Sequence, residues 1–332
     1  MRRSALLLTV ALAIAACSPD DGAAGTTTAA DPTTTEAPAT RATPATSAPL
    51  ATTSTAGFPV SVEADNGAVT IEELPNRIVS LSSTATEMLF AIDAGDQVVA
   101  VDDQSNYPAT APITDLAAFT PNIEAILSYQ PDLVVISYEP GDLVASLQAA
   151  EVPVLFQNAA ATMADVYHQI EALGVATGHP EEAASVNDEI ETRLAEIVAD
   201  TPKAPEGTSY YHELDNTYYT VTSSTFFGEL YGLFGLENIA DPADADGAAA
   251  GYPQLSGEYI VSADPDLIFL ADTLYGESAE TVAARPGWEV LTAVREGHVI
   301  SLDSDIASRW GPRIVEFAEA VSAAVEAYVS QG

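Results

Sequence analysis

Two matching stretches of sequence decide the fold: NIEAILSYQPDLVV at residues 122–135 and SGEYIVSADPDLIF at residues 256–269. Each has the pattern of a short helix, followed by Pro-Asp-Leu and an apolar run. Such a run is typical of a strand in a parallel sheet that is covered on both faces. Each places one Glu in the first turn of its helix, Glu124 and Glu258, where a carboxylate also favours the helix dipole. The repeat predicts two α/β units of the same design.

The same alternation extends outward from both stretches. We expect strands at residues 77–81, 97–101, 132–136 and 152–156, then at 210–214, 218–221, 266–270 and 298–302. We expect helices at 84–91, 122–128, 141–150, 225–234, 256–262, 287–294 and 312–329. In the first of these, Thr84 is the expected N-cap and Glu87 would complete a capping box. Strands and helices in alternation predict right-handed βα units and doubly wound lobes.

A long helical stretch separates the two units. Residues 162–200 are helical in pattern, with an interruption near Gly178-His179-Pro180. Pro180 suits a first helical position, so residues 180–198 should form one helix of about 28 Å. We therefore predict an α/β protein with an N-terminal lobe at 58–178, a linking helix at 179–202 and a C-terminal lobe at 203–332.

Charge and cysteine content exclude several classes of protein. The 332 residues contain 10 Lys+Arg against 49 Asp+Glu, a formal net charge of −39, and Lys203 is the only Lys. Nucleic-acid binding needs clustered cations, so no nucleic-acid partner is expected. One Cys excludes an internal disulfide framework and Cys-rich metal sites. The acidic surface has two interpretations, solubility in a saline environment or binding of cations.

The first residues resemble the export signal of bacterial lipoproteins. A basic Met1-Arg2-Arg3 precedes a short apolar run, which ends in Ile14-Ala15-Ala16-Cys17, similar to a lipobox. The resemblance implies that residues 1–16 are removed and that Cys17 is lipidated, which anchors the protein extracytoplasmically on the outer face of the cell membrane. An ordinary signal peptide is the alternative. Residues 17–57 are rich in Thr, Ala and Pro, which predicts a disordered tether.

The chain from residue 76 to 332 resembles a known family. The matching stretches are 77–82 followed by Thr86-Glu87, then 106–108, 122–135, the linking helix, 235–239, 252–256 and 304–313. Together they resemble the helical-backbone, or class III, periplasmic binding proteins that feed cobalamin and ferric-siderophore ABC importers. The resemblance implies two lobes joined by one rigid helix, with the ligand in a cleft between them. It also implies capture of a metal chelate and its delivery to a permease, with no enzymatic activity.

The resemblance also implies a set of site residues in the loops that follow the strands. The candidate ligand-binding residues are Ser82, Ser83, Thr84, Tyr107, Phe119, Tyr138, His212, Tyr252, Arg309 and Trp310. Aromatic walls suit a large flat chelate. Arg309 would suit an anionic group such as a catecholate, or an amide or phosphate of a corrinoid, or would form a surface salt bridge instead. The serines and Thr84 could bind an anion, although helix capping is their commoner role.

The same resemblance implies the partners. Glu124 and Glu258 would lie on the outer rim, one on each lobe, and meet Arg residues of a permease dimer that works with its ATPase subunits. The membrane contact would be the lipid anchor, and the head would be a monomer without a protein-ligated cofactor. The four His residues are far apart in sequence, so no metal site is expected.

The cargo stays open between two chelate classes. Arg309 favours an anionic siderophore, whereas Tyr252-Pro253-Gln254 and the short first lobe favour cobalamin. A receptor for haem or free metal ions on the same scaffold is another alternative. A surface-anchored α/β hydrolase is the rival from another class, and His212 is the only candidate base that the sequence offers it. No nucleophile elbow, phosphate loop or dinucleotide fingerprint is present.

Overall fold

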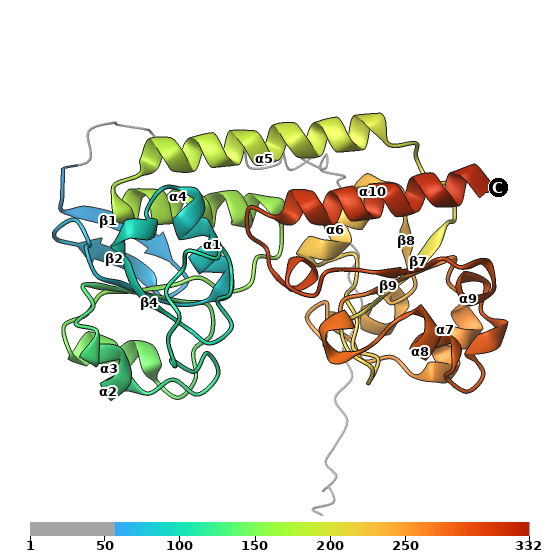
Figure 1. Cartoon of the computed structure of the whole chain (residues 1–332), viewed down its shortest axis with the longest axis horizontal. Coiled ribbons are helices and arrows are strands. Elements are labelled where there is room, and N and C mark those ends of the chain that lie inside the picture. Colours follow the sequence, from blue (N-terminus) through green and yellow to red (C-terminus); the bar gives the residue numbers. More distant parts are fainter. Residues whose placement is uncertain (1–56, 332) are drawn as a thin grey trace, which may run out of the picture. The chain divides into compact units, whose positions relative to one another are not determined.

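Two four-stranded parallel sheets form the framework of the computed structural model, which describes residues 57–331 (Figure 1). The first sheet has the order β4 (Val98–Val101), β3 (Ile78–Leu81), β5 (Leu133–Ile136) and β6 (Val154–Phe156). The second has the order β10 (Val299–Ser301), β9 (Leu267–Leu270), β7 (Ser209–Glu213) and β8 (Glu237–Asn238). In each sheet the first strand along the chain lies between the second and the third. The predicted α/β class with two similar sheets is confirmed.

The central strands are continuous apolar runs because both faces of each sheet are covered. All residues of β3, β5 and β9 are buried. Ile78 and Leu133 pack into one apolar cluster, whereas Val79 and Val134, one position further on, pack into a second cluster on the opposite face. This alternation is the two-residue period of a strand.

Short helices connect the strands, as Figure 1 shows. In the first part of the chain they are α1 (Ser83–Ala91), α2 (Ile123–Ser128) and α3 (Leu143–Ala149), and in the later part they are α6 (Phe226–Leu233), α7 (Gly257–Ala263), α8 (Ala279–Ala283) and α9 (Thr292–Glu296). Asn122 caps α2 and Ser256 caps α7, each through a side chain that accepts the backbone N–H three residues on. The two repeated stretches of sequence therefore begin their helices in the same way.

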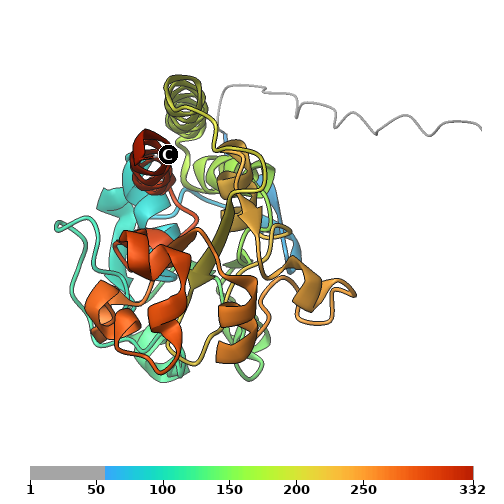
Figure 2. The same ribbon diagram turned by 90° about the vertical axis from the view of Figure 1, so that its right-hand side faces the viewer.

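Three longer helices lie on one side of the sheets. The helix α4 (Met163–Thr177) starts with a capping box between Thr162 and Asp165 and ends at Gly178. The φ angle there is 80°, a left-handed value that glycine adopts more readily than other residues. The chain then reverses into α5 (Pro180–Asp200), a helix of about 30 Å. Both α4 and the C-terminal helix α10 (Ile314–Gln331) pack against α5, and Figure 2 looks along α5 and α10.

One apolar cluster runs through both sheets and the long helices. It contains Val135 of the first sheet, Phe269 of the second, Ile190 of α5 and Phe317 of α10. The described residues accordingly belong to one compact unit. The two sheets therefore share a core, which α4, α5 and α10 complete.

Three local predictions were wrong or incomplete, and one hairpin was not predicted. Ser82, not Thr84, caps α1, because its side chain accepts the N–H of Ala85. Residues 218–221 form only a bridge between Tyr219 and Gln254, and β8 occupies the edge of the second sheet instead. The helix expected at 287–294 is broken at Leu291 into a 3₁₀ turn (Trp288–Val290) and α9. The hairpin of β1 (Val60–Ala64) and β2 (Gly67–Ile71) was not predicted.

Some predictions fall on residues that the structure does not describe. The signal peptide at 1–16, Cys17 and the tether as far as residue 56 lie outside the described residues. Between residues 57 and 331, no helix has the length and apolar character needed to cross a membrane. The lobe boundaries at 178/179 and 202/203 stay a prediction.

Candidate functional site

The carboxyl ends of the parallel strands define where a ligand would bind. Open α/β sheets bind ligands at these ends, beside the point where the strand order reverses. In the first sheet that point lies between β3 and β5, and in the second it lies between β7 and β9. The loops after β3, β4 and β5, and those after β7 and β9, are therefore the candidate site.

The serine-rich loop after β3 is mainly a helix cap. Ser82 and Thr84 are buried and Ser83 is half-buried. The Thr86 hydroxyl donates to the Ser82 carbonyl at 2.9 Å and lies 2.9 Å from the hydroxyls of Ser80 and Ser105. These hydroxyls hold the loop against the start of α1. Of the three predicted residues, Ser83 is the one with accessible surface.

Aromatic side chains are exposed in the loops of the first sheet. Tyr107 and Phe119 lie in the loop after β4, and Tyr138 follows β5. Phe119 is 68% exposed, and its ring meets that of Tyr138 edge-on with 6.2 Å between centroids. An exposed aromatic pair of this kind is unusual for a surface that contacts only water. It is a suitable wall for a flat apolar ligand.

The second sheet presents a comparable set, most of which the sequence analysis missed. Tyr252 is 38% exposed, and the partial burial of its side chain raises the pKa of its hydroxyl. Tyr219 follows β7, and Leu274 and Tyr275 follow β9, with Tyr275 81% exposed. Their position in the loops after strands was the available signal that they belong to the site. The sequence of the helical turn Thr273–Tyr275 did not indicate that its side chains are exposed.

His212 lies in the core and does not reach this surface. Its ring is fully buried, stacks on Phe227 with 5.9 Å between centroids, and its Nδ1 lies 2.8 Å from the hydroxyl of Tyr231. Burial lowers the pKa of His212 to about 3, so the ring is neutral. This placement corrects the expectation that His212 contacts ligand, and it removes the only candidate base of the hydrolase alternative.

Arg309 is also unavailable to a ligand. Its guanidinium donates to Glu87 at 2.6 Å, to Asp305 at 2.8 Å and to the carbonyl of Gln104 at 3.0 Å. The side chain is 7% exposed and that of Glu87 is 2% exposed. The expectation of an anion-binding Arg309 is therefore corrected. Its alternative, a surface salt bridge, is corrected as well, because the ion pair is buried.

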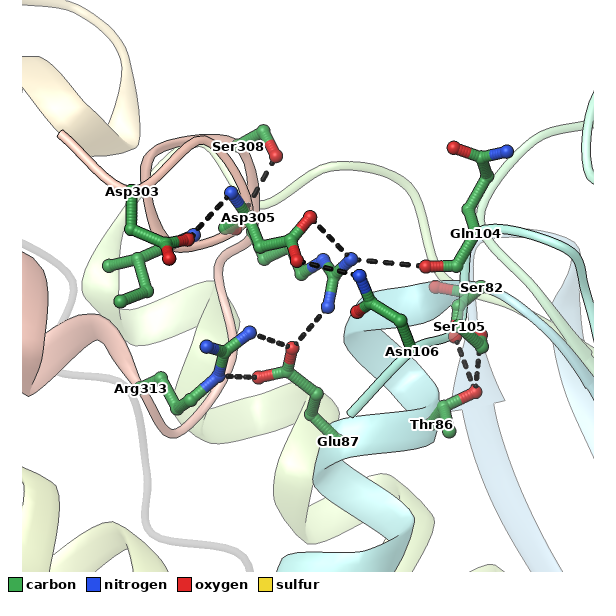
Figure 3. A network of polar contacts seen from close by, with 12 residues as sticks. Ser82, Thr86, Glu87, Gln104, Ser105, Asn106, Asp303, Asp305, Ser308 and Arg313 are labelled. Carbon is green, nitrogen blue, oxygen red and sulfur yellow. Dashed lines mark hydrogen bonds and ion pairs between the residues drawn. The ribbon is translucent and has the colours of Figure 1, made fainter. Parts of the chain in front are cut away.

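A polar network surrounds this ion pair, and Figure 3 shows its members. Arg313 donates to both oxygens of Glu87 at 2.6 and 2.9 Å, and its guanidinium lies 4.2 Å from the ring centre of Tyr107. Asn106 donates to Asp305 at 2.7 Å. We call this set the junction network, because it joins the loop after β4 and α1 to the segment before α10; its members are Glu87, Gln104, Asn106, Asp305, Arg309 and Arg313.

Trp310 lies beside the junction network, half-buried. Its indole N–H donates to the side-chain oxygen of Gln169 on α4 at 2.8 Å. The ring also packs against the large apolar cluster. Trp310 therefore has a structural role that the sequence did not predict.

A second cluster of buried charges lies at the carboxyl ends of β7 and β9. Arg285 donates to both oxygens of Glu213, at 2.5 and 2.6 Å, and to Glu277 at 2.7 Å, while its guanidinium lies 4.7 Å from the ring centre of Trp288. Asp272 is buried beside them, and neither carboxyl oxygen has a partner. Burial, followed by the negative charge of Glu213, raises the pKa of Asp272 to about 7.

Glu124 and Glu258 are both exposed in the first turns of α2 and α7. Each helix runs back along its sheet, so its first turn lies toward the carboxyl ends of the strands. Figure 1 shows α2 and α7 on the side away from α5. The described residues include no group of three or more His, Cys, Asp or Glu that could hold a metal ion.

Comparison with known proteins identifies the family. The family model described as periplasmic binding protein matches residues 78–306. The chain belongs to this family of periplasmic binding proteins. The ABC transporter substrate-binding lipoprotein YvrC of Bacillus subtilis is 32% identical over 82% of this chain and 87% of its own length. A protein named cobalamin-binding protein in Halobacterium salinarum is 32% identical over 78% of this chain and 72% of its own.

Solved structures have the same fold. The periplasmic vitamin B12 binding protein BtuF of Vibrio cholerae matches with a TM-score of 0.62 and 26% identity, covering 78% of this chain and all of that one. The heme binding protein HutB of the same organism matches with a TM-score of 0.66 and 21% identity, covering 74% of this chain and 97% of that one. The chain is thus a substrate-binding protein of the ABC transporter type, a family whose members bind their ligand and are not enzymes.

Proposed function

We propose that this protein captures an electrically neutral corrinoid of the cobalamin type at the carboxyl ends of its two sheets and delivers it to an ABC permease. The observation that carries the choice of cargo is the commitment of Arg309 to Glu87 and Asp305. An anionic ligand needs charge-assisted donors to replace the water that it loses on binding. Arg309 was the candidate donor, and it is already paired.

The other cations near the strand ends are committed in the same way. Arg285 pairs with Glu213 and Glu277, and Arg313 pairs with Glu87. A ferric tris-catecholate carries several negative charges, and haem carries two propionates. The periphery of a corrinoid consists mainly of neutral amides, which exposed tyrosine hydroxyls and backbone groups can bind. The charges of the described residues therefore favour a neutral cargo.

Exposed aromatic rings support a macrocyclic ligand. Phe119 and Tyr138 at the first sheet, and Tyr219 and Tyr275 at the second, offer apolar surface next to hydroxyl groups. Burying such rings against a macrocycle supplies most of the binding free energy, while the hydroxyls orient the amides. The name of the Halobacterium salinarum relative agrees with this choice.

Docking and anchoring complete the proposal. Glu124 and Glu258 are matched carboxylates on matched helices, so they suit a partner with two-fold symmetry that presents one cation to each. Cys17 would carry the lipid that holds the protein at the membrane surface. The permease would then meet a tethered partner at high local concentration.

Isothermal titration of the full chain tests the cargo. We expect saturable binding of cyanocobalamin, and binding at least about tenfold weaker, a difference of about 1.4 kcal/mol, for a ferric tris-catecholate and for haem. Tyr138→Ala and Tyr275→Ala should each weaken cyanocobalamin binding about tenfold. Val175→Ala, an exposed apolar change on α4, is the control and should have no effect. Tighter binding of an anionic chelate would overturn the neutral cargo.

A further inference from the structure

The two parts of the molecule that bear the sheets carry large charges of the same sign. The N-terminal half, defined as residues 57–178, has 17 acidic residues against one Arg, a formal charge of −16. The C-terminal half, defined as residues 203–331, has 21 acidic residues against five Lys or Arg, which is also −16. Charges of this size repel each other over distances set by the ionic strength. Something in the structure must oppose that repulsion.

The junction network is the place where cations of one half enter the other. Arg309 and Arg313 belong to the C-terminal half, and both donate to Glu87, which belongs to α1 of the N-terminal half. Arg309 also donates to the carbonyl of Gln104, and Asn106 returns a hydrogen bond to Asp305. Two of the five cations of the C-terminal half are thus used across the junction.

Burial makes these contacts much less sensitive to salt than the surface charges are. Glu87 is almost fully buried and Arg313 is 15% exposed. Removing one member of a buried ion pair leaves the other uncompensated, which is much more costly than losing a surface pair. The repulsion between the halves, in contrast, acts through solvent. Its range is about 30 Å at 0.01 M salt and about 3 Å at 1 M salt.

We infer that the junction network is an electrostatic lock, which holds the two mutually repelling halves at a fixed separation and so keeps the two ligand-binding edges in register at low ionic strength. The apolar core and α5 connect the halves on one side. The lock connects them through the loop after β4 and the segment before α10. The inference depends only on the charges and contacts of the chain and not on which cargo it binds.

The test measures the separation of the halves directly. Spin labels are placed at Ser128→Cys on α2 and Ser262→Cys on α7, both exposed, in the full chain with Cys17→Ser. Electron–electron double resonance then gives the distribution of distances between the two labels. It is measured at about 0.01 M salt, where the repulsion is long-ranged, and at about 1 M salt, where it is short-ranged. With Glu87 intact, the distance distribution should be the same at both salt concentrations. With Glu87→Gln, it should shift to longer distances and broaden at low salt, and return to the parental distribution at high salt.

Matched variants separate the lock from a general change of charge. Glu206→Gln removes the same charge from an exposed loop residue and should behave as the parent. Arg313→Gln should shift the distribution in the same direction but less than Glu87→Gln does, because Arg309 still pairs with Glu87. The double variant should add little to Glu87→Gln alone, because the contact of Arg313 with the Glu87 carboxylate is already lost. An unchanged distribution in Glu87→Gln at low salt overturns the lock. A broadening that persists unchanged at 1 M salt also overturns it, since local unfolding and not repulsion would then be the cause.

Ligand affinity provides a second readout, and this part rests on the proposed function. Glu87→Gln should weaken cargo binding at low salt and leave it near the parental value at high salt, since pre-organisation is what the lock supplies. If no chelate binds the parent, the proposed function fails while the distance measurement still decides the lock.

Discussion

Single buried titratable residues decide how this protein responds to pH. His212 has a pKa of about 3 because it is buried, against about 6.5 when it is exposed in the unfolded chain. The folded state therefore binds fewer protons than the unfolded state between these values. This contribution to the free energy of unfolding is complete above pH 6.5 and is lost progressively as the pH falls toward 3.

Replacing His212 should remove that loss. Between pH 6.5 and 5, the parent should lose about 2 kcal/mol of unfolding free energy from this group, and His212→Gln should not. The variant should be about 1 kcal/mol less stable at pH 7.5, where the bond with Tyr231 is weakened. Urea titrations at pH 5, 6.5 and 7.5 measure the free energy of unfolding of the parent and the variant. His168→Gln, at an exposed helix position, is the control, and equal pH slopes for His212→Gln and the parent would contradict the assignment.

Asp272 should act in the opposite direction. Its pKa is about 7 in the folded state, above that of an unfolded Asp, so its carboxyl costs stability as the pH rises from about 4 to 7. Asp272→Asn should therefore have a free energy of unfolding about 1–3 kcal/mol higher than that of the parent at pH 8. This difference should shrink as the pH falls and vanish near pH 4. Asp188→Asn on α5, which is exposed, should show no such difference. A variant less stable than the parent at pH 8 would mean that the ionised carboxyl has a stabilising partner.

At the scale of elements, the reversal between α4 and α5 depends on the absence of a side chain. A Cβ at Gly174 would lie 2.4 Å from the Cβ of Ala183 and 2.9 Å from the carbonyl oxygen of His179. Both neighbours belong to the start of α5 or the turn before it, and neither can move without moving the helix. The close approach of α4 and α5 therefore requires glycine at this position.

Gly174→Ala should separate these helices. We expect a loss of about 1–3 kcal/mol of unfolding free energy from overpacking, measured by urea titration. Gly232→Ala on α6 is the matched control, because a Cβ there meets nothing within 4 Å, and it should gain about 0.5–1 kcal/mol from helix propensity. If both variants gained stability, the helices would not be in the close contact described.

Elements that have strong local signals were predictable, and those that depend on distant partners were not. The apolar runs of β5 and β9, the proline at the start of α5 and the caps of α2 and α7 are all visible in the sequence. The strand β8 has two residues, Glu237 and Asn238, and exists only because β7 offers it an edge. The residues 218–221 have β propensity, but no strand lies where they could pair with it fully.

The candidate site was predictable in position and less so in chemistry. Loops after strands contain the exposed Phe119 and Tyr138, as expected. Arg309 and His212 also follow or end strands, but a sequence does not tell which partner a side chain meets. Glu87 lies 222 positions from Arg309, and their pairing depends on the whole fold. The role of a single residue in a buried polar network could therefore not be predicted from the sequence pattern.

At the scale of the whole molecule, docking should be separable from binding. Glu124→Arg combined with Glu258→Arg should leave cyanocobalamin affinity unchanged and abolish uptake by cells, because rim charges control association with a partner. Glu181→Arg with Glu280→Arg, also exposed first-turn positions, is the control and should leave uptake intact. Weaker cargo binding by the folded double variant would remove the docking assignment.

The shared core has a consequence for how the protein matures. Phe317, Val321 and Val325 of the last helix complete a cluster that also contains Ile78 of β3 and Val135 of β5. A partial chain that ends before Ile314 therefore cannot bury these early strands fully. Loss of the C-terminal helix should accordingly leave part of this core open to solvent and raise the sensitivity of the protein to proteases.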